Sequence, residues 1–263
     1  MFQSRVVDKA LEDWIFTEWD KLHIRLGPDQ PLSQTRLVLP APGFFELDAE
    51  TPETKAEAIF DKVKTYAGME DWAVNLEAFE AHKHEQVSDY VVMQPAEPVP
   101  AGLFQVDGQE TPTIRFDIAL VDSPSSLIAT FAHELAHYLL WSTGHYEGDI
   151  DLDDELITDL AAVYLGFGVF LANDAFEMRG ESGYYGSSWS WRRAGYLSED
   201  SFLLATALFV ETSIMPHDAA TPYLKPHLGK RFPKALKQIL RRSDDLERIW
   251  KRDTSFVKKA DES

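Results

Sequence analysis

An apolar segment that contains two histidines and a glutamate constrains the fold of this chain more than any other feature. Between Ser126 and Leu140, His133, Glu134 and His137 stand among alanine, leucine and aromatic side chains. This composition predicts a buried helix, and a buried polar group without a partner destabilises a fold. Whatever packs against the helix must therefore supply partners for two imidazoles and one carboxylate.

The spacing of the two histidines indicates that a metal ion is the partner. Side chains four residues apart lie on one face of a helix, so the imidazoles of His133 and His137 can reach one ion. Glu134 follows the first histidine and would project beside the ion, where it can take a proton from a metal-bound water. The competing interpretation is that the pattern is a coincidence and that the three side chains serve packing.

A third metal ligand is expected eighteen residues after His137. Glu155 and Asp159 are four residues apart and begin an apolar stretch that must itself be buried. Catalytic zinc sites have three protein ligands and one open position, and Glu155 would complete the set. Asp159 would accept the outer N–H of a ligating histidine and fix its tautomer. The acidic residues 151–154 are better explained as a solvated helix N-terminus, although Asp151 and Glu155 form a rival pair with the same spacing.

These residues resemble the catalytic core of the gluzincin metallopeptidases, in which H-E-x-x-H on one helix is followed by E-x-x-x-D on the next. The resemblance covers roughly residues 112–172. It implies that His133, His137 and Glu155 bind one Zn²⁺ per chain, that Glu134 is the general base and that Asp159 orients a histidine. It also implies a zincin-like fold, in which a sheet packs on two central helices that carry the zinc ligands.

Charge and composition exclude several classes of protein. The chain has 263 residues, with 25 basic and 44 acidic side chains and a formal charge of −19, which argues against nucleic acid or an anionic membrane surface as a partner. It has no cysteine, so a disulfide framework and a thiol nucleophile are excluded. The N-terminus lacks the layout of a signal peptide and the longest apolar run, Leu160–Ala172, is shorter than a membrane span. We therefore expect a cytoplasmic protein.

Hydrophobic periodicity predicts an α+β fold in three parts. Residues 1–69 would form an N-terminal extension of helices and loops, with a short strand at Thr35–Leu39. Residues 70–250 would form the metallopeptidase domain, and residues 251–263 a frayed tail. Alternating residues between 70 and 121 predict a small, mostly antiparallel sheet, with a hairpin turn at Asp107-Gly108.

Several helices and one functional strand follow from the same patterns. Ser123 and Pro124 are expected to begin the helix of the histidines. By the resemblance, Ile114–Leu120 would be the strand at the sheet edge that holds a substrate backbone, with an ordinary edge strand as the alternative. The other helices are expected at residues 5–22, 54–66 and 199–210, and as a basic pair within 231–249.

Peptide hydrolysis also requires a hydrogen-bond donor for the oxyanion of the tetrahedral intermediate. The sequence does not choose among the candidates, which are His145, Tyr146, Tyr184, Tyr185, Arg192, Arg193 and Tyr196.

The expected function is hydrolysis of a peptide bond in a peptide or protein substrate. Two alternatives stay open. One is a regulatory or binding protein that zinc stabilises, in which a fourth ligand such as His145 or Asp151 closes the site. The other is a protease dedicated to one cytoplasmic protein. Hydrolysis of a non-peptide amide is a third possibility, because the motif specifies the metal and the base and leaves the substrate open.

Overall fold

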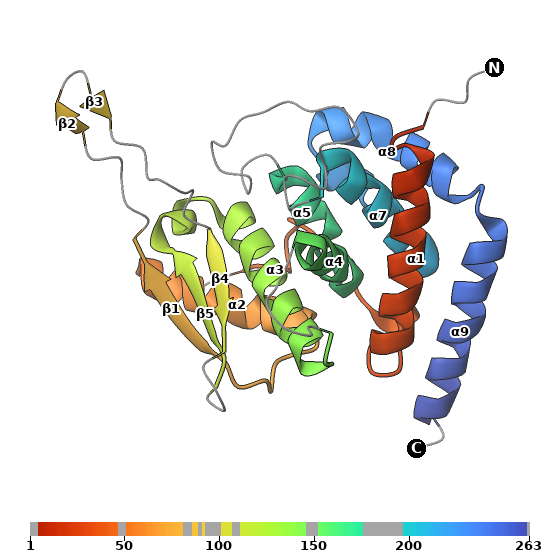
Figure 1. The fold of residues 1–263 in the computed structure, drawn as a ribbon, viewed down its shortest axis with the longest axis horizontal. Coiled ribbons are helices and arrows are strands. Elements are labelled where there is room, and N and C mark those ends of the chain that lie inside the picture. Colours follow the sequence, from red (N-terminus) through yellow and green to blue (C-terminus); the bar gives the residue numbers. More distant parts are fainter. Residues whose placement is uncertain are drawn as a thin grey trace.

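The computed structural model places a small β-sheet beside a larger group of helices (Figure 1). It describes residues 5–46, 51–80, 86–88, 91–92, 101–106, 111–145, 152–175 and 197–261. Within these ranges the chain is mostly helical and has a three-stranded mixed sheet, which confirms the α+β class.

The sheet has the strand order β1-β5-β4, formed by β1 (Asn75–Phe79), β5 (Thr113–Asp117) and β4 (Gly102–Gln105). β4 and β5 are antiparallel, as the hairpin signal predicted, although the turn itself lies outside the described residues. β1 pairs parallel with β5, so the expectation of a mostly antiparallel sheet was wrong for this sheet. A separate antiparallel pair consists of β2 (Gln86–Ser88) and β3 (Val91–Val92).

The prediction that Ile114–Leu120 forms an edge strand was also wrong. β5 ends at Asp117 and the chain continues as a 3₁₀ turn, η2 (Ile118–Asp122). Because β1 and β4 pair with its two sides, β5 has no free edge. Alternation along one strand reports which face is buried and does not report how many neighbours the strand has. The edge strand next to the histidine helix is β4.

Helices α2 (Pro52–Tyr66) and α3 (Pro124–Ser142) pack against each other beside the sheet. A capping box between Thr51 and Thr54 begins α2. Pro124 occupies the first turn of α3 as expected, but the Ser123 hydroxyl makes no capping hydrogen bond. Every residue from Ser126 to Leu140 is buried, which confirms the prediction of a buried helix.

The helix that follows α3 is interrupted by a turn, and this turn contacts the N-terminal loop around Arg36 and Val38. α4 (Leu152–Ala162) is followed by a π-helical turn, η3 (Val163–Phe167), and by α5 (Gly168–Asp174). In this turn Gly166 has φ +98°, and a Cβ there would stand 2.1 Å from the carbonyl oxygen of Arg36. The Gly166 carbonyl accepts the Val38 N–H at 3.0 Å. Thr35–Leu39 is therefore not a strand, because it pairs with a helix break instead of a sheet.

The segment Asp154–Asp174 is long and apolar enough to cross a membrane by length and composition alone. However, 89% of its apolar window is buried inside the protein. Its surroundings are those of a core helix.

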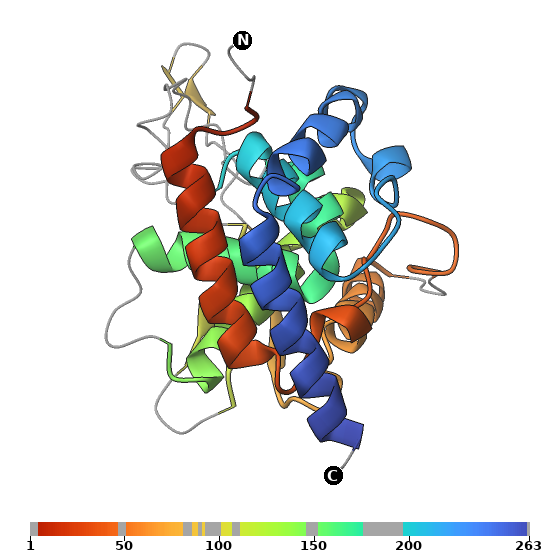
Figure 2. The same cartoon turned by 90° about the vertical axis from the view of Figure 1, so that its right-hand side faces the viewer.

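The remaining helices pack around α4 and α5, and α7 (Glu199–Thr212) is itself buried from Ser201 to Thr212. α1 (Lys9–Leu26) and α9 (Ser243–Asp261) lie side by side (Figure 2), and α7 packs on both α5 and α8 (Pro226–Ile239). The short turns η1 (Leu32–Gln34) and η4 (Thr221–Tyr223) complete the described elements.

Residues 251–261, expected to fray, continue α9. Asp253 anchors this helix, because its carboxylate is buried and accepts the N–H groups of Leu32 at 2.7 Å and Ser33 at 3.2 Å.

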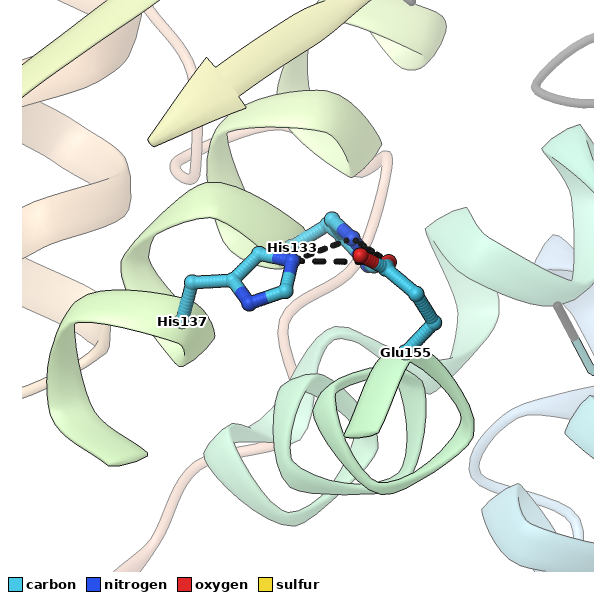
Figure 3. A group of neighbouring side chains, drawn as sticks. All are labelled: His133, His137 and Glu155. Atoms are coloured by element: carbon cyan, nitrogen blue, oxygen red, sulfur yellow. Dashed lines mark hydrogen bonds and ion pairs between the residues drawn. The ribbon is translucent and has the colours of Figure 1, made fainter. Parts of the chain in front are cut away.

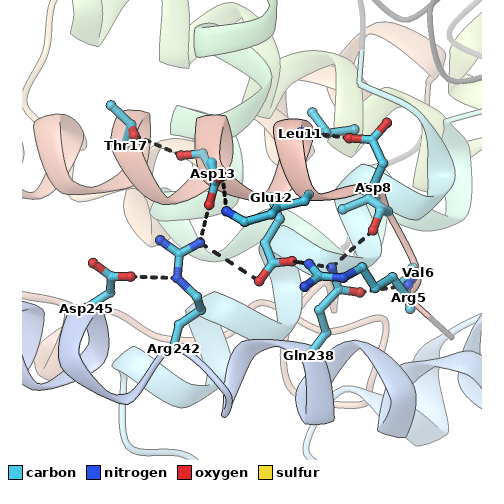
Figure 4. Close-up of polar contacts among 12 residues, drawn as sticks. Arg5, Val6, Asp8, Leu11, Glu12, Asp13, Thr17, Gln238, Arg242 and Asp245 are labelled. Atoms are coloured by element: carbon cyan, nitrogen blue, oxygen red, sulfur yellow. Dashed lines mark hydrogen bonds and ion pairs between the residues drawn. The ribbon is translucent and has the colours of Figure 1, made fainter. Parts of the chain in front are cut away.

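The N-terminal segment is tied to α8 by a buried polar cluster (Figure 4). The Gln238 side chain accepts the Val6 N–H at 2.7 Å and donates to the Glu12 carboxylate at 2.8 Å. Arg5 pairs with the same carboxylate, and Arg242 bonds to Asp13 at 2.6 Å. Residues from both ends of the chain thus share one hydrophobic core with the central helices.

Candidate metal centre

Helices α3 and α4 bring together the three ligands that the sequence predicted (Figure 3). The Nε2 atoms of His133 and His137 are 3.1 Å apart. The Oε2 atom of Glu155 lies 3.2 Å from the first and 3.4 Å from the second. Four-coordinate zinc with bonds of about 2.0–2.1 Å places its ligand atoms about 3.3–3.4 Å apart. The three side chains therefore fit the binding of one such ion.

The cluster is enclosed on the histidine side and reaches solvent on the glutamate side. The side chains of His133 and His137 are 5% and 6% exposed, whereas that of Glu155 is 25% exposed. Glu155 is therefore the partly exposed member of a group whose two imidazoles are buried.

The electrostatics of the cluster favour a positive charge at its centre. Burial disfavours the charged form of His133, but its hydrogen bonds with Asp159 and Glu155 raise its pKa well above the ordinary value. Burial also opposes ionisation of Glu155, and bonds with His133 and His137 hold its pKa far below the ordinary value. A divalent cation would satisfy the same demand for positive charge without protonating the histidines.

Asp159 lies where the sequence predicted, behind His133. Its Oδ1 atom is 3.0 Å from Nδ1 of His133, and its Oδ2 atom accepts the Leu197 N–H at 2.7 Å. Asp159 is fully buried, and burial raises its pKa. An outer carboxylate of this kind fixes the ring so that Nε2 points at the metal.

Thr158 holds the second histidine and was missed by the sequence analysis. Its Oγ1 atom lies 3.2 Å from Nδ1 of His137. The sequence position of Thr158 could have indicated this contact, because Thr158 is three residues after Glu155 and shares a helical face with it. A threonine carries no charge, so the pattern of acidic side chains on this helix does not include it.

Glu134 is buried between the histidines and strand β4. Burial raises its pKa, while both histidines and the backbone N–H of Phe104 on β4 favour its charged form. Gly102, also on β4, approaches the carboxylate closely. The position of Glu134 beside the three ligands is the one expected of a general base.

An aromatic group lies next to His137. The Phe104 ring is nearly parallel to the imidazole, with an interplanar angle of 6° and a centroid distance of 6.4 Å. Tyr138 and Trp141 pack on the same phenyl ring. Phe104 therefore lies between His137 and these two aromatic rings, and it is a further residue beside the cluster that the sequence did not indicate.

Of the remaining candidates for a fourth ligand or an oxyanion donor, the structure describes His145 alone. His145 is not part of the ligand group, and its Nε2 atom lies 3.6 Å from Oδ1 of Asp154. The other fourth-ligand candidate, Asp151, and the oxyanion candidates at positions 146, 184, 185, 192, 193 and 196 lie outside the described residues.

No family model, no curated protein and no solved structure matches this chain.

Proposed function

We propose that the protein is a zinc-dependent metallopeptidase that hydrolyses peptide bonds in a peptide or protein substrate. The observation that carries the proposal is the convergence of His133, His137 and Glu155 within hydrogen-bonding distance of one another, with Glu134 beside them. Zinc held there would lower the pKa of a water towards neutrality and polarise a carbonyl oxygen.

The chain's own groups supply the proton transfers and the orientation. Glu134 takes the proton of the attacking water and passes it to the leaving amine. Its burial favours this role, because a raised carboxyl pKa brings the base closer to neutral pH. Asp159 keeps the ring of His133 in the tautomer whose Nε2 lone pair faces the centre.

The free edge of β4 is the place where we propose that substrate backbone binds. Among the described strands β4 pairs with β5 alone, and α3 packs next to it. An extended peptide added antiparallel to this edge would run past Glu134 and the ligand group. This assignment replaces Ile114–Leu120, because β5 is paired on both sides and ends at Asp117.

Metal content tests the first part of the proposal. The purified protein and its His137→Ala and Glu155→Ala variants are resupplied with zinc, desalted and measured by plasma mass spectrometry. We expect one zinc per chain in the wild type and a loss in both variants. A wild type that binds no zinc would overturn the proposal and leave the histidines as packing residues.

A cleavage experiment tests the second part. The zinc-loaded protein and its Glu134→Gln variant are incubated with a proteome-derived peptide library and with intact lysate, and new peptide termini are identified by mass spectrometry. We expect cleavage by the wild type and none by the variant, which should retain zinc. Zinc binding without any cleavage would contradict peptidase activity and favour a zinc-stabilised binding protein. Cleavage of one lysate protein alone would identify a dedicated protease.

A further inference from the structure

We propose that Thr158 fixes the tautomer of His137 and thereby strengthens metal binding at this centre. The proposal rests on the proposed function, because it assumes that His137 is a metal ligand. It assigns a positioning role to a neutral side chain, whereas the sequence pattern assigned such a role only to Asp159.

The argument begins with the single proton of the Thr158 hydroxyl. Thr158 donates it to the backbone carbonyl of Asp154, one helical turn earlier, at 2.9 Å. The carbonyl can only accept and is the nearer of the two partners, so we assign the hydroxyl proton to it. Oγ1 then faces Nδ1 of His137, 3.2 Å away, with a lone pair, and the imidazole is the donor in this contact. The proton of neutral His137 then resides on Nδ1, and its Nε2 atom presents a lone pair to the centre.

The opposite tautomer would have good partners inside the cluster. A proton on Nε2 of His137 would point at Oε2 of Glu155, 3.4 Å away, and at Nε2 of His133, 3.1 Å away. That arrangement satisfies the side chains without a metal, and it must be undone before a metal can bind. The Thr158 contact opposes it because a bare Nδ1 could bond to the hydroxyl only if the hydroxyl proton left the Asp154 carbonyl.

Helix α4 therefore holds both histidines of α3 through consecutive residues. Asp159 bonds to Nδ1 of His133 and Thr158 bonds to Nδ1 of His137. Both Thr158 and Asp159 are fully buried, so water does not compete for either contact. The same turn of helix also carries Glu155, so one element places a ligand and orients the other two.

The test compares zinc affinities of the wild type, Thr158→Val and Thr158→Ser by competition with a chromophoric chelator. Valine keeps the shape and removes the acceptor, so we expect affinity to fall by about 10–100-fold, as for loss of other outer partners of metal ligands. Serine keeps the acceptor and should stay within about 3-fold of the wild type. Thr212→Val is the matched control, because Thr212 is also buried and bonds its hydroxyl to the carbonyl of Leu208 one turn earlier, but on α7.

A second measurement can overturn the proposal with the wild type alone. Long-range ¹H–¹⁵N spectra of histidine-labelled, metal-free wild type at pH 8 report which ring nitrogen of His137 carries the proton. We expect Nδ1–H, with a shift towards Nε2–H in Thr158→Val. An Nε2–H tautomer in the wild type would overturn the proposal.

The outcomes separate this proposal from the proposed function. Zinc binding that is equal in the wild type and in folded Thr158→Val overturns the role of Thr158 and leaves the metal centre intact. A wild type that binds no zinc overturns both. Equal losses in Thr158→Val and Thr212→Val would show a general effect on folding and also overturn the role of Thr158.

Discussion

Gly102 lies so close to Glu134 that a Cβ atom at position 102 would stand 2.6 Å from the Oε1 atom of the carboxylate. The same Cβ would meet the methyl group of Thr130 at 2.6 Å. Strand β4 can therefore rest on α3 only because position 102 has no side chain, and this close approach lets the Phe104 N–H reach Glu134. The edge of the sheet and the proposed base are thus positioned by one glycine.

The Gly102→Ala variant should displace the Glu134 carboxylate or push β4 away from α3. We expect a loss of about 1–3 kcal/mol in the free energy of unfolding, as for other overpacked sites, measured by urea denaturation. Zinc content should be unchanged, and hydrolysis of any substrate found should fall by at least about 10-fold, because a misplaced catalytic group loses rate steeply. Leu103→Ala is the control, since Leu103 is exposed on the same strand. Wild-type stability and rate in Gly102→Ala would contradict this account of the contact.

Zinc should stabilise the wild type against unfolding and should not stabilise Glu155→Ala. A ligand that binds only the folded state at about 100 times its Kd adds about 2.7 kcal/mol to the free energy of unfolding. Urea denaturation with zinc and with a chelator measures this difference in each protein. Glu199→Ala is a suitable control because it removes an acidic side chain outside the ligand group. A zinc effect of equal size in Glu155→Ala would exclude Glu155 as a ligand.

The proximity of His133, His137 and Glu155 was predictable because these residues are close in sequence or on consecutive helices. His133 and His137 are fixed relative to each other by one helical turn, and the buried surface of α3 followed from the apolar residues around them. The prediction of Glu155 required only that the next apolar helix pack against α3, and α3 and α4 are in contact. Local periodicity was sufficient for each of these steps.

The errors concern features that depend on residues distant in the chain. The sequence of β5 does not reveal that β1 pairs parallel with it. Thr35–Leu39 has the pattern of a strand, but its partner is the π-helical turn at Gly166, which composition does not identify. Residues 251–261 looked polar enough to fray. They are ordered as α9 because Asp253 caps the turn at Leu32, more than two hundred residues earlier.

His23 should make stability depend on pH at mildly acidic values. It is fully buried against Tyr164, whose hydroxyl lies 3.0 Å from Nδ1, and burial lowers the pKa of His23. In the unfolded chain the pKa of His23 is about 6.5, so below that pH the unfolded chain binds more protons than the folded protein. His23 therefore contributes its full stability above about pH 6.5 and loses this contribution as the pH falls through the lower pKa of the folded state. The slope is at most about 1.4 kcal/mol per pH unit.

Urea denaturation of the wild type and His23→Gln between pH 5.5 and 7.5, with a chelator present, measures this contribution. The ligand histidines are common to both proteins and cancel in the difference. We expect the difference in free energy of unfolding to favour the wild type at pH 7.5 and to shrink towards pH 5.5. A difference that is constant over this range would show that His23 does not titrate on unfolding.

The polar cluster around Gln238 should be the main attachment of the N-terminal segment (Figure 4). The Gln238 side chain is buried and bonds to the Val6 N–H, the Val7 carbonyl and Glu12. Gln238→Leu keeps a similar volume and leaves these buried groups without that amide, so we expect a loss of about 2–4 kcal/mol in the free energy of unfolding. Lys237→Ala, at the adjacent exposed position, should change it by less than about 0.5 kcal/mol.

Limited proteolysis distinguishes a local release from a general loss of stability. If the amide is the attachment, Gln238→Leu should be cleaved near Arg5 under conditions in which the wild type and Lys237→Ala are intact. Arg5 also pairs with Glu12, so a second attachment exists. Protection of the Arg5 region in Gln238→Leu would show that the amide is not the main attachment and that the Arg5–Glu12 ion pair and the buried side chains of Val6 and Val7 hold the segment.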